Sequence, residues 1–463
     1  MRRCLKLTVA IAVVACVAAL TITSAVGQTS TTTGTSTVAN YGPTTNGNAH
    51  AAKAVKGEKL TGTAGSGLTR GVTSSTVKVG CYLQQAAFAG ADAGYKARFS
   101  RANSTKELPG GRTIDFQACK DDGSNAQTNL QIIQGLVQQD QVFAVVGVSA
   151  DVLPASTDFM NTNQVPFLGW GFLPGFCHTR WGFGFDGCLI TATTDNPLVY
   201  QSNLALGPIE AAGLKPSAAK VALQTGDDEA GHASVPTIGN LYKLEGATVV
   251  YAESNIPVPG PPASFTPFVT AILATHPNIL ETLVSFASAP GLTAAMTAGG
   301  FTGTNINFVG YIPGLLGSSA QLAAAFNGAY VSAQIVPQEA QTAYIKQMET
   351  DLVSSSAPTG KFITLSIAIA YAQADVLVSM LKATGSTLNT KTFDAKINNG
   401  NYTYKSSAEG GPGQMEYPAM HHIASDCAAV LKINGPGASY IPTVPFTCYD
   451  SPVVTVKKGG KKK

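Results

Sequence analysis

The stretch that decides the fold is VFAVVGVSADVLPASTDFMNTNQVPFLGWGFLPG, residues 142–175. Its apolar, β-branched start at residues 142–148 predicts a strand that is covered on both faces. Helical spacing of apolar residues over 152–161, with Pro154 in the first turn, predicts a helix, and residues 165–168 begin a second strand. Backbone N–H groups and the positive end of the helix dipole meet at the turn between strand and helix. The turn is therefore predicted to bind a carboxylate or another anion.

The same pattern of strand followed by helix recurs along the chain. It occurs in residues 76–139, begins again after residues 194–197 and continues to about residue 311. Strands separated by helices imply parallel sheets with right-handed crossovers. Because 463 residues exceed one ordinary core, the sequence predicts an α/β protein with two lobes.

Charge is unevenly distributed along the chain. Only 12% of the residues are charged, 44% are hydrophobic, and the formal net charge is +3. Residues 1–69 contain six Lys/Arg and one Glu, and residues 457–463 contain five Lys, so residues 70–456 carry −7. A mildly acidic folded part argues against nucleic acid as a partner.

The N-terminus has the pattern of an export signal. Three basic residues precede an apolar run over 7–26, and a cut before Gln28 would remove residues 1–27 as a signal peptide. Two alternatives stay open. Cys16 fits a lipoprotein signal, and the run is long enough to remain in the membrane as an anchor. All three place the protein outside the cytoplasm, in the periplasm or on the outer face of the cell membrane.

Three segments lie outside the strand-and-helix pattern. Residues 28–69 are mostly Thr, Ser, Gly and Asn, so we expect a disordered tether. Residues 453–463 form a Lys-rich tail, for which a solvated end is expected. Polar residues interrupt a long apolar helix at 362–381, which favours a buried core helix over a membrane span.

The cysteines predict disulfides. Cys4 and Cys16 lie in the signal, which leaves an even six: Cys81, Cys119, Cys177, Cys188, Cys427 and Cys448. Six cysteines allow fifteen pairings, and an oxidising compartment favours structural disulfides over buried thiols. Proximity in sequence favours Cys177–Cys188 and Cys427–Cys448, with the other two on the first two strands. Metal binding is not expected, because no CxxC or HxxxH spacing accompanies them.

No motif argues for catalysis. The GxGxxG at residues 182–187 has no strand before it and no amphipathic helix after it, as a dinucleotide site requires. We interpret it as an aromatic loop held by Cys177–Cys188. GxSxG, HExxH and P-loop motifs are absent. His421 and His422, adjacent on a predicted strand, would point to opposite faces, which argues against a shared metal. We therefore expect a protein that is not an enzyme and has no cofactor and no metal.

The order of parts resembles the branched-chain amino-acid (Leu/Ile/Val) type of extracytoplasmic solute-binding protein, the type I periplasmic-binding-protein fold that feeds ABC importers. The matching segments are VKVGCYL, GGRTIDFQACKDDGSNAQTNLQ, the opening stretch and the Thr-Asp-Asn-Pro at 194–197. The resemblance implies two Rossmann-like lobes with parallel sheets, joined by a three-strand hinge, that close over a small solute. It implies lobe 1 at 70–195 plus 334–418 and lobe 2 at 196–333 plus 419–452.

The resemblance also implies a ligand site. Matched by position, the hydroxyl and N–H groups at residues 149–150 hold a ligand carboxylate, residues 170–172 follow the next strand, and each lobe offers an aromatic. The ligand-binding residues implied in this way are Ser149, Ala150, Trp170, Gly171, Phe172, Phe286 and Phe88.

Two positions depart from the resemblance. No acid lies near Ile312, where the family places the partner of an α-ammonium group, and Ala230 replaces an aromatic. The expected ligand is therefore an amino acid, an aromatic acid, an amide or another small carboxylate. We expect a monomer that delivers this solute to an ABC permease in the membrane. The alternative is an envelope-tethered sensor with the same fold and no role in transport.

Overall fold

The computed structural model describes residues 36–39, 42–43, 48–85, 88–189, 191, 194–227, 229–258, 260–308, 311–406 and 410–456. The predicted export signal and the basic end of the Lys-rich tail lie outside the described residues.

Lobe 1 is built on a parallel sheet of six strands, in the order β4-β3-β6-β7-β8 with β5 also paired to β3. The central strand β6 is buried along its whole length, as its continuous apolar run predicts. The strands are β3 (Thr76–Leu83), β4 (Thr113–Phe116), β5 (Lys120–Asp121), β6 (Ala144–Val148), β7 (Phe167–Gly169) and β8 (Gly182–Gly184). Because β8 begins the GxGxxG motif, the interpretation of that motif as a loop is wrong for its first half.

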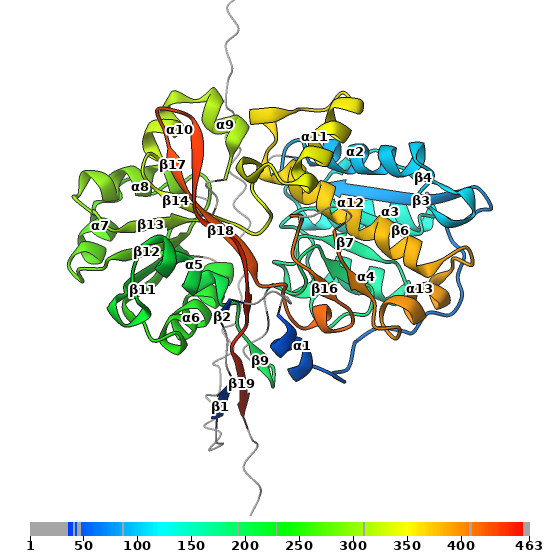
Figure 1. Cartoon of the computed structure of the whole chain (residues 1–463), viewed down its shortest axis with the longest axis horizontal. Helices are drawn as coiled ribbons and strands as arrows, with labels where there is room; N and C mark the ends of the chain where they lie inside the picture. The colour runs from blue at the N-terminus through cyan, green and yellow to red at the C-terminus, as the bar shows by residue number, and fades with distance from the viewer. Residues whose placement is uncertain are drawn as a thin grey trace, which may run out of the picture. The chain divides into compact units, whose positions relative to one another are not determined.

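Helices cover both faces of this sheet (Figure 1). One layer contains α2 (Ala91–Ser104), α11 (Ala343–Ser354), α12 (Leu365–Thr384) and α13 (Thr390–Ile397), and the other contains α3 (Ala126–Gln138) and α4 (Pro154–Thr162). Among the described residues, α12 is the one helix long and apolar enough to cross a membrane, but 78% of its most apolar window is buried inside the protein. This burial agrees with the predicted core helix.

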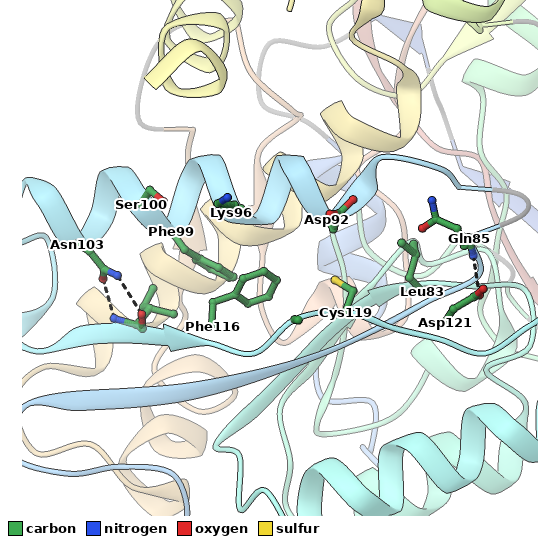
Figure 2. A pocket seen from close by; sticks show the side chains of 12 residues that line it. Leu83, Gln85, Asp92, Lys96, Phe99, Ser100, Asn103, Phe116, Cys119 and Asp121 are labelled. Carbon is green, nitrogen blue, oxygen red and sulfur yellow. Dashed lines mark hydrogen bonds between the residues drawn. The ribbon is translucent and has the colours of Figure 1, made fainter. Parts of the chain in front are cut away.

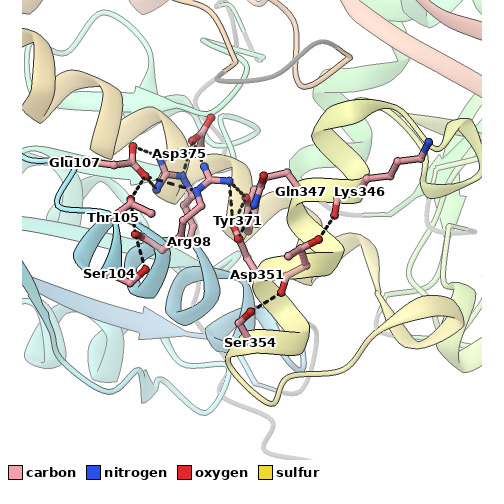
Figure 3. Close-up of polar contacts among 12 residues, drawn as sticks. Arg98, Ser104, Thr105, Glu107, Lys346, Gln347, Asp351, Ser354, Tyr371 and Asp375 are labelled. Atoms are coloured by element: carbon pink, nitrogen blue, oxygen red, sulfur yellow. Dashed lines mark hydrogen bonds and ion pairs between the residues drawn. The ribbon is translucent and has the colours of Figure 1, made fainter.

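A buried polar network ties the first helical layer together (Figure 3). On α2, the guanidinium of Arg98 pairs with Asp375 of α12 and, at 2.9 Å, with Glu107. Arg101, one turn further on, pairs with Asp351 of α11 at 3.0 Å. Because each buried charge has a partner, the network fixes α2 relative to α11 and α12.

Lobe 2 is built on a mixed sheet of eight strands, in the order β11-β10-β12-β13-β14-β17-β18-β2. The first five strands are parallel and the last three antiparallel. They are β2 (Gly42–Pro43), β10 (Lys220–Gly226), β11 (Thr248–Ile256), β12 (Ile279–Leu283), β13 (Thr304–Asn307), β14 (Tyr330–Ala333), β17 (Cys427–Asn434) and β18 (Ser439–Asp450). Its helices are α5 (Asn203–Ala211), α6 (Glu229–Leu244), α7 (Thr266–Leu273), α8 (Ala289–Ala298), α9 (Pro313–Ser318) and α10 (Ala320–Ala325).

Three segments that run between the two sheets lie within residues 185–202, 334–342 and 417–426, and the chain also passes from β2 in one sheet to β3 in the other. The lobe bounds implied by the resemblance stay a prediction. The remaining short strands are β1 (Ser36–Ala39), β9 (Leu198–Val199), β15 (Thr403–Tyr404), β16 (Met415–Glu416) and β19 (Val453–Val456). The single-turn 3-10 helices are η1 (Pro109–Gly111), η2 (Pro174–Phe176), η3 (Pro216–Ala218), η4 (Gln338–Ala340), η5 (Gly360–Phe362) and η6 (Ala419–His421). The start of the expected C-terminal tail is β19, which pairs with β1 and β9.

Residues 48–69 are folded, which differs from the disordered tether expected over 28–69. They contain helix α1 (Ala49–Ala54), and Asn48 is buried, donating to the carbonyl of Ala424 at 2.7 Å and accepting from the N–H of Ser451 at 2.9 Å. The segment is held by hydrogen bonds to distant residues and by burial of the small apolar residues Ala51 and Val55. Its polar composition therefore did not reveal its order.

Three disulfides join the cysteine pairs Cys177–Cys188, Cys427–Cys448 and Cys81–Cys119. The first two pairings are those favoured by sequence proximity. Cys427 and Cys448 lie directly opposite each other on the β17–β18 hairpin. The prediction of structural disulfides is confirmed.

Candidate functional site

Loops that follow the carboxyl ends of the parallel strands carry the predicted ligand residues. In lobe 1, residues 84–88 follow β3, Ser149 follows β6 and Trp170 follows β7. In lobe 2, Phe286 follows β12 and Tyr311 follows β13. In open α/β sheets, ligands bind outside the carboxyl ends of the strands, so these loops form the candidate site.

The hydroxyl of Ser149 is already engaged inside the protein. It donates to Oδ2 of Asp122 at 2.6 Å and accepts from the N–H of Asp151 at 2.9 Å. The N–H of Ala150 donates to Oε1 of Gln84 at 3.1 Å. Ser149 is 4% exposed. These contacts do not support its predicted role as a hydroxyl donor to a ligand carboxylate, because its proton already points at Asp122.

The turn after β6 also differs from the predicted anion site in its backbone. Helix α4 begins at Pro154, with five residues between it and the end of the strand, and its N-cap is Leu153, which makes no side-chain cap. No polar residue at 149–151 therefore caps this helix. The N–H groups of the first helical turn are therefore displaced from the strand end.

Acceptor oxygens dominate this end of lobe 1. Asp122 is fully buried and also accepts from Asn129 at 3.0 Å and from the N–H of Ser124 at 3.1 Å. Asp151 has a buried Oδ2 with no hydrogen-bond partner among the described residues. Burial, with the charge of Asp122 as a second cause, raises the pKa of Asp151. The site thus offers carboxyl and hydroxyl oxygens that can accept hydrogen bonds from a ligand.

Three of the predicted aromatic residues come together. The Phe88 and Trp170 rings are 6.2 Å apart, Phe88 and Phe172 are 6.5 Å apart, and Trp170 meets Phe172 edge-on at 5.3 Å. The indole N–H of Trp170 donates to Oε1 of Gln334 at 3.0 Å, in the second connection between the lobes. We call Phe88, Trp170 and Phe172 the aromatic cluster; it supplies an apolar surface at the carboxyl ends of β3 and β7.

Gly171 occupies a position without room for a side chain. A Cβ there would lie 1.9 Å from the carbonyl oxygen of Gly187, and the Gly171 carbonyl accepts from the N–H of Leu189 at 3.0 Å. The residue joins the aromatic cluster to the loop closed by Cys177–Cys188. Its observed contacts are therefore with the protein's own backbone.

Lobe 2 contributes a separate set of groups. Phe286 is 40% exposed and has no ring contact with the aromatic cluster in the described part of the chain. Tyr311 donates to Glu339 at 2.8 Å and accepts from the N–H of Gln338. Burial raises the pKa of Glu339. A carboxyl group therefore lies beside the loop near Ile312, although it comes from a different segment from the one in which the family places its acid.

Sequence reasoning did not single out several residues that the structure places in this region. Asp122 was visible only as part of an Asp-Asp turn, and Gln84 had no distinctive pattern around it. Gln334 and Glu339 lie far along the chain from the loops that they contact. No local spacing could reveal these pairs, because the fold brings them together across lobe connections.

Three histidines, the buried His421 and His422 and the half-buried His178, lie near two of the segments that run between the sheets. His421 lies on η6, not on a strand as expected, and is fully buried, with ring nitrogens 2.9 Å from the carbonyl of Gly182 and 2.7 Å from Asn398. Nδ1 of His422 is 2.7 Å from Nδ1 of His178. Burial, and next the neighbouring His178, lowers the pKa of His422 to about 4. Among the described residues, no group of His, Cys, Asp or Glu is arranged to hold a metal ion.

Two cavities lie away from the predicted ligand residues. One, of about 540 Å³, lies between α2 and β4 in lobe 1, and one of about 390 Å³ lies near the amino ends of β13 and β14 in lobe 2. None of the seven predicted ligand residues lines either cavity. The ligand assignment therefore stays a prediction.

Comparison with solved structures shows which proteins share this fold. A solute-binding protein of an ABC transporter from R. palustris, in complex with 4-hydroxybenzoate, has 16% identity and a TM-score of 0.61, covering 81% of this chain and 97% of its own. A fatty acid ABC transporter substrate-binding protein from Thermomonospora curvata has 15% identity and a TM-score of 0.63. The match covers 82% of this chain and 94% of that protein. A possible leucine/isoleucine/valine-binding protein from Rhodopirellula baltica SH 1 has 13% identity and a TM-score of 0.60. The match covers 80% of this chain and 96% of that protein.

Among curated proteins, none matches the chain. The periplasmic binding protein family, in contrast, matches residues 83–438, which include most of both sheets. The chain belongs to the periplasmic binding protein family.

Proposed function

We propose that the protein captures a small solute with an aromatic or other apolar body and a hydrogen-bond donor group, and delivers it to an ABC permease. The observation that carries this proposal is that the aromatic cluster and the Ser149–Asp122 pair follow the carboxyl ends of the paired strands β3, β6 and β7. Family membership supports capture outside the cytoplasm, and the fold supports closure of two lobes over the solute. The ligand assignment, the monomeric state and the mode of membrane attachment are part of the proposal.

The donor group follows from the charges around Ser149. Its oxygen keeps a free lone pair but has no proton to offer, and Asp122 lies behind it at 2.6 Å. A ligand carboxylate at this place would face the charge of Asp122 at short range in a poorly solvated environment, which is unfavourable. An amide, hydroxyl or ammonium group would instead donate to the available oxygens. Among the solutes expected from the sequence, amides therefore fit best, and a hydroxyl-bearing aromatic offers the same kind of donor.

The aromatic body follows from the rings of the cluster. Aromatic pairs prefer edge-to-face or offset contacts, and the cluster already shows the edge-on geometry between Trp170 and Phe172. The related protein from R. palustris binds 4-hydroxybenzoate, which combines an aromatic ring with a hydroxyl donor and a carboxylate. The hydroxyl group of that molecule could donate to the oxygens of Ser149 and Asp122, whereas its carboxylate would be repelled by Asp122. Comparing an amide with the corresponding acid therefore tests whether the site prefers a donor or an anion.

The experiment compares benzamide with benzoate by calorimetry on the full chain. We expect benzamide to bind more tightly than benzoate, and Asp122→Asn to narrow that difference because it removes the repelling charge. Trp170→Ala should weaken benzamide at least about tenfold, as loss of a buried aromatic contact typically does. The matched control is Phe301→Ala, which removes an aromatic ring before the amino end of β13 and should leave binding unchanged.

Two outcomes would contradict the proposal. Tighter binding of benzoate than of benzamide would show that the site accepts an anion after all. Equal binding by the wild type and Trp170→Ala would show that the aromatic cluster is not the ligand surface. Thermal unfolding of each variant checks that a loss of binding does not come from a loss of fold.

A further inference from the structure

The larger cavity of lobe 1 lies along an open edge of the sheet. It has a volume of about 540 Å³ and runs between one side of α2 and the strand β4 (Figure 2). In the described part of the chain, no strand pairs with the outer edge of β4. The cavity is thus bordered on one side by main-chain groups rather than by side chains alone.

The hydrogen bonds of β4 show which of its groups face outward. The N–H groups of Thr113 and Gln117 donate inward, to the carbonyls of Ser75 and Val79. Because strand residues alternate in direction, the N–H and C=O of Ile114 and of Phe116 point away from β3. The outward N–H and C=O groups of these two residues are those with which an added strand would form hydrogen bonds.

Asn103 of α2 already occupies the first of these two positions. Its Nδ2 donates to the carbonyl of Ile114 at 2.9 Å, and its Oδ1 accepts from the N–H of Ile114 at 2.7 Å (Figure 2). A carboxamide carries the same donor and acceptor as a peptide unit. The Asn103 side chain therefore acts as one peptide unit of a strand that is otherwise missing.

The second position, Phe116, opens onto the cavity. The ring of Phe116 packs on Phe99 of α2 at 5.1 Å, which gives the cavity an apolar floor. Ser100 and Lys96 lie on the α2 side, and the two carboxylates, Asp92 and Asp121, lie toward the end opposite Asn103 (Figure 2). The cavity combines a main-chain edge, an apolar surface and an acidic end.

We propose that this cavity binds a short peptide in an extended conformation. The peptide adds to the edge of β4 next to the Asn103 carboxamide, as in β-augmentation, with its main chain paired to Phe116. An apolar side chain lies on the Phe99–Phe116 floor, and the peptide's amino terminus lies at the acidic end by Asp92 and Asp121. A volume of about 540 Å³ is within the usual range for small-ligand sites. None of the seven predicted ligand residues lines this cavity, although Gln85 and Asp121 adjoin Gln84 and Asp122 of the proposed solute site in the chain.

The first test fills the cavity and measures binding of trivaline to the full chain by calorimetry. Ser100→Trp places a large ring in the cavity from an exposed position of α2 and should weaken trivaline at least about tenfold. The matched control is Ser104→Trp, on the same helix four residues further on but outside the cavity, which should bind trivaline like the wild type. No binding of trivaline by the wild type, or equal binding by both Trp variants, would overturn the proposal.

The second test addresses the acidic end with a variant that keeps the cavity open. Asp92→Asn should weaken trivaline by about threefold to fivefold, the usual contribution of an exposed ion pair, and should leave N-acetyl-trivaline unchanged. Asp115→Asn removes the same charge from β4 outside the cavity and is the control. Equal binding of the free and acetylated peptides by the wild type would overturn the placement of the amino terminus. Neither test uses a ligand of the solute site, so its failure would be distinct from failure of the proposed function.

Discussion

Gly171 and Gly135 illustrate how the same substitution has opposite effects at two residues. A Cβ at Gly171 would lie 1.9 Å from the carbonyl oxygen of Gly187, whereas a Cβ at Gly135, inside α3, meets nothing within 4 Å. We expect Gly171→Ala to lower the free energy of unfolding by about 1–3 kcal/mol, because two backbone segments must separate. Gly135→Ala should raise it by about 0.5–1 kcal/mol, because alanine favours the helix. Urea unfolding of both variants measures the difference, and a loss of equal size in both would contradict this reading of Gly171.

The polar residues of the site show what can be predicted from a residue and its neighbours in the chain. Ser149 could be placed after a strand from the apolar run before it, and the structure has it there. The direction of its hydroxyl depends on Asp122, which lies 27 residues earlier in the chain. A pattern that covers one strand and one helix does not include that partner, so the position was predictable and the hydrogen bond was not.

At the scale of elements, the segment at residues 48–69 contributes to the fold of both lobe 1 and the lobe connections. Val55 is buried, and the indole N–H of Trp181 donates to the carbonyl of Thr63 at 3.0 Å. The N–H of Gly65 donates to Asp394 at 2.8 Å, and the N–H of Leu68 donates to Thr390 at 3.0 Å. Removing the segment leaves these buried partners without their hydrogen bonds.

Truncation measures this contribution. A chain that begins at residue 70 should have a free energy of unfolding at least about 3 kcal/mol below that of a chain that begins at residue 48, since each unsatisfied buried group costs about 1–3 kcal/mol. The full chain serves as the reference for the variant that begins at residue 48. Urea unfolding curves that coincide for the two truncated chains would mean that the segment is the tether expected from its composition.

At the scale of the whole molecule, a buried carboxyl group makes stability depend on pH. Glu281 lies on β12, is fully buried and accepts from the hydroxyl of Tyr242, while its Oε1 has no partner among the described residues. Burial raises the pKa of Glu281 from its usual value of 4.5 to about 8. Because the pKa of Glu281 is higher in the folded than in the unfolded state, its protonation stabilises the fold. This contribution is fully present below the pKa of the unfolded state and is lost as the pH rises through the pKa of the folded state.

The variant Glu281→Gln tests this dependence. Glutamine keeps an acceptor for Tyr242 and does not titrate, so between pH 5 and 9 the variant should lose about 3–4 kcal/mol less stability than the wild type. Glu253→Gln, at an exposed position of β11, is the control and should follow the wild type. Parallel curves of unfolding free energy against pH for the wild type and Glu281→Gln would contradict the prediction.

The sequence by itself determined the α/β fold, the division into two sheets and the disulfide pairs close in the chain. These features depend on apolar spacing and cysteine proximity within short stretches, where each residue constrains its neighbours directly. Only the tertiary structure decided the order at residues 48–69, the contacts of His178 with His422, and the engagement of Ser149 by Asp122. Each of these depends on hydrogen bonds between residues distant in sequence. Such bonds follow from how the folded elements are placed, and composition or periodicity carries no record of that placement.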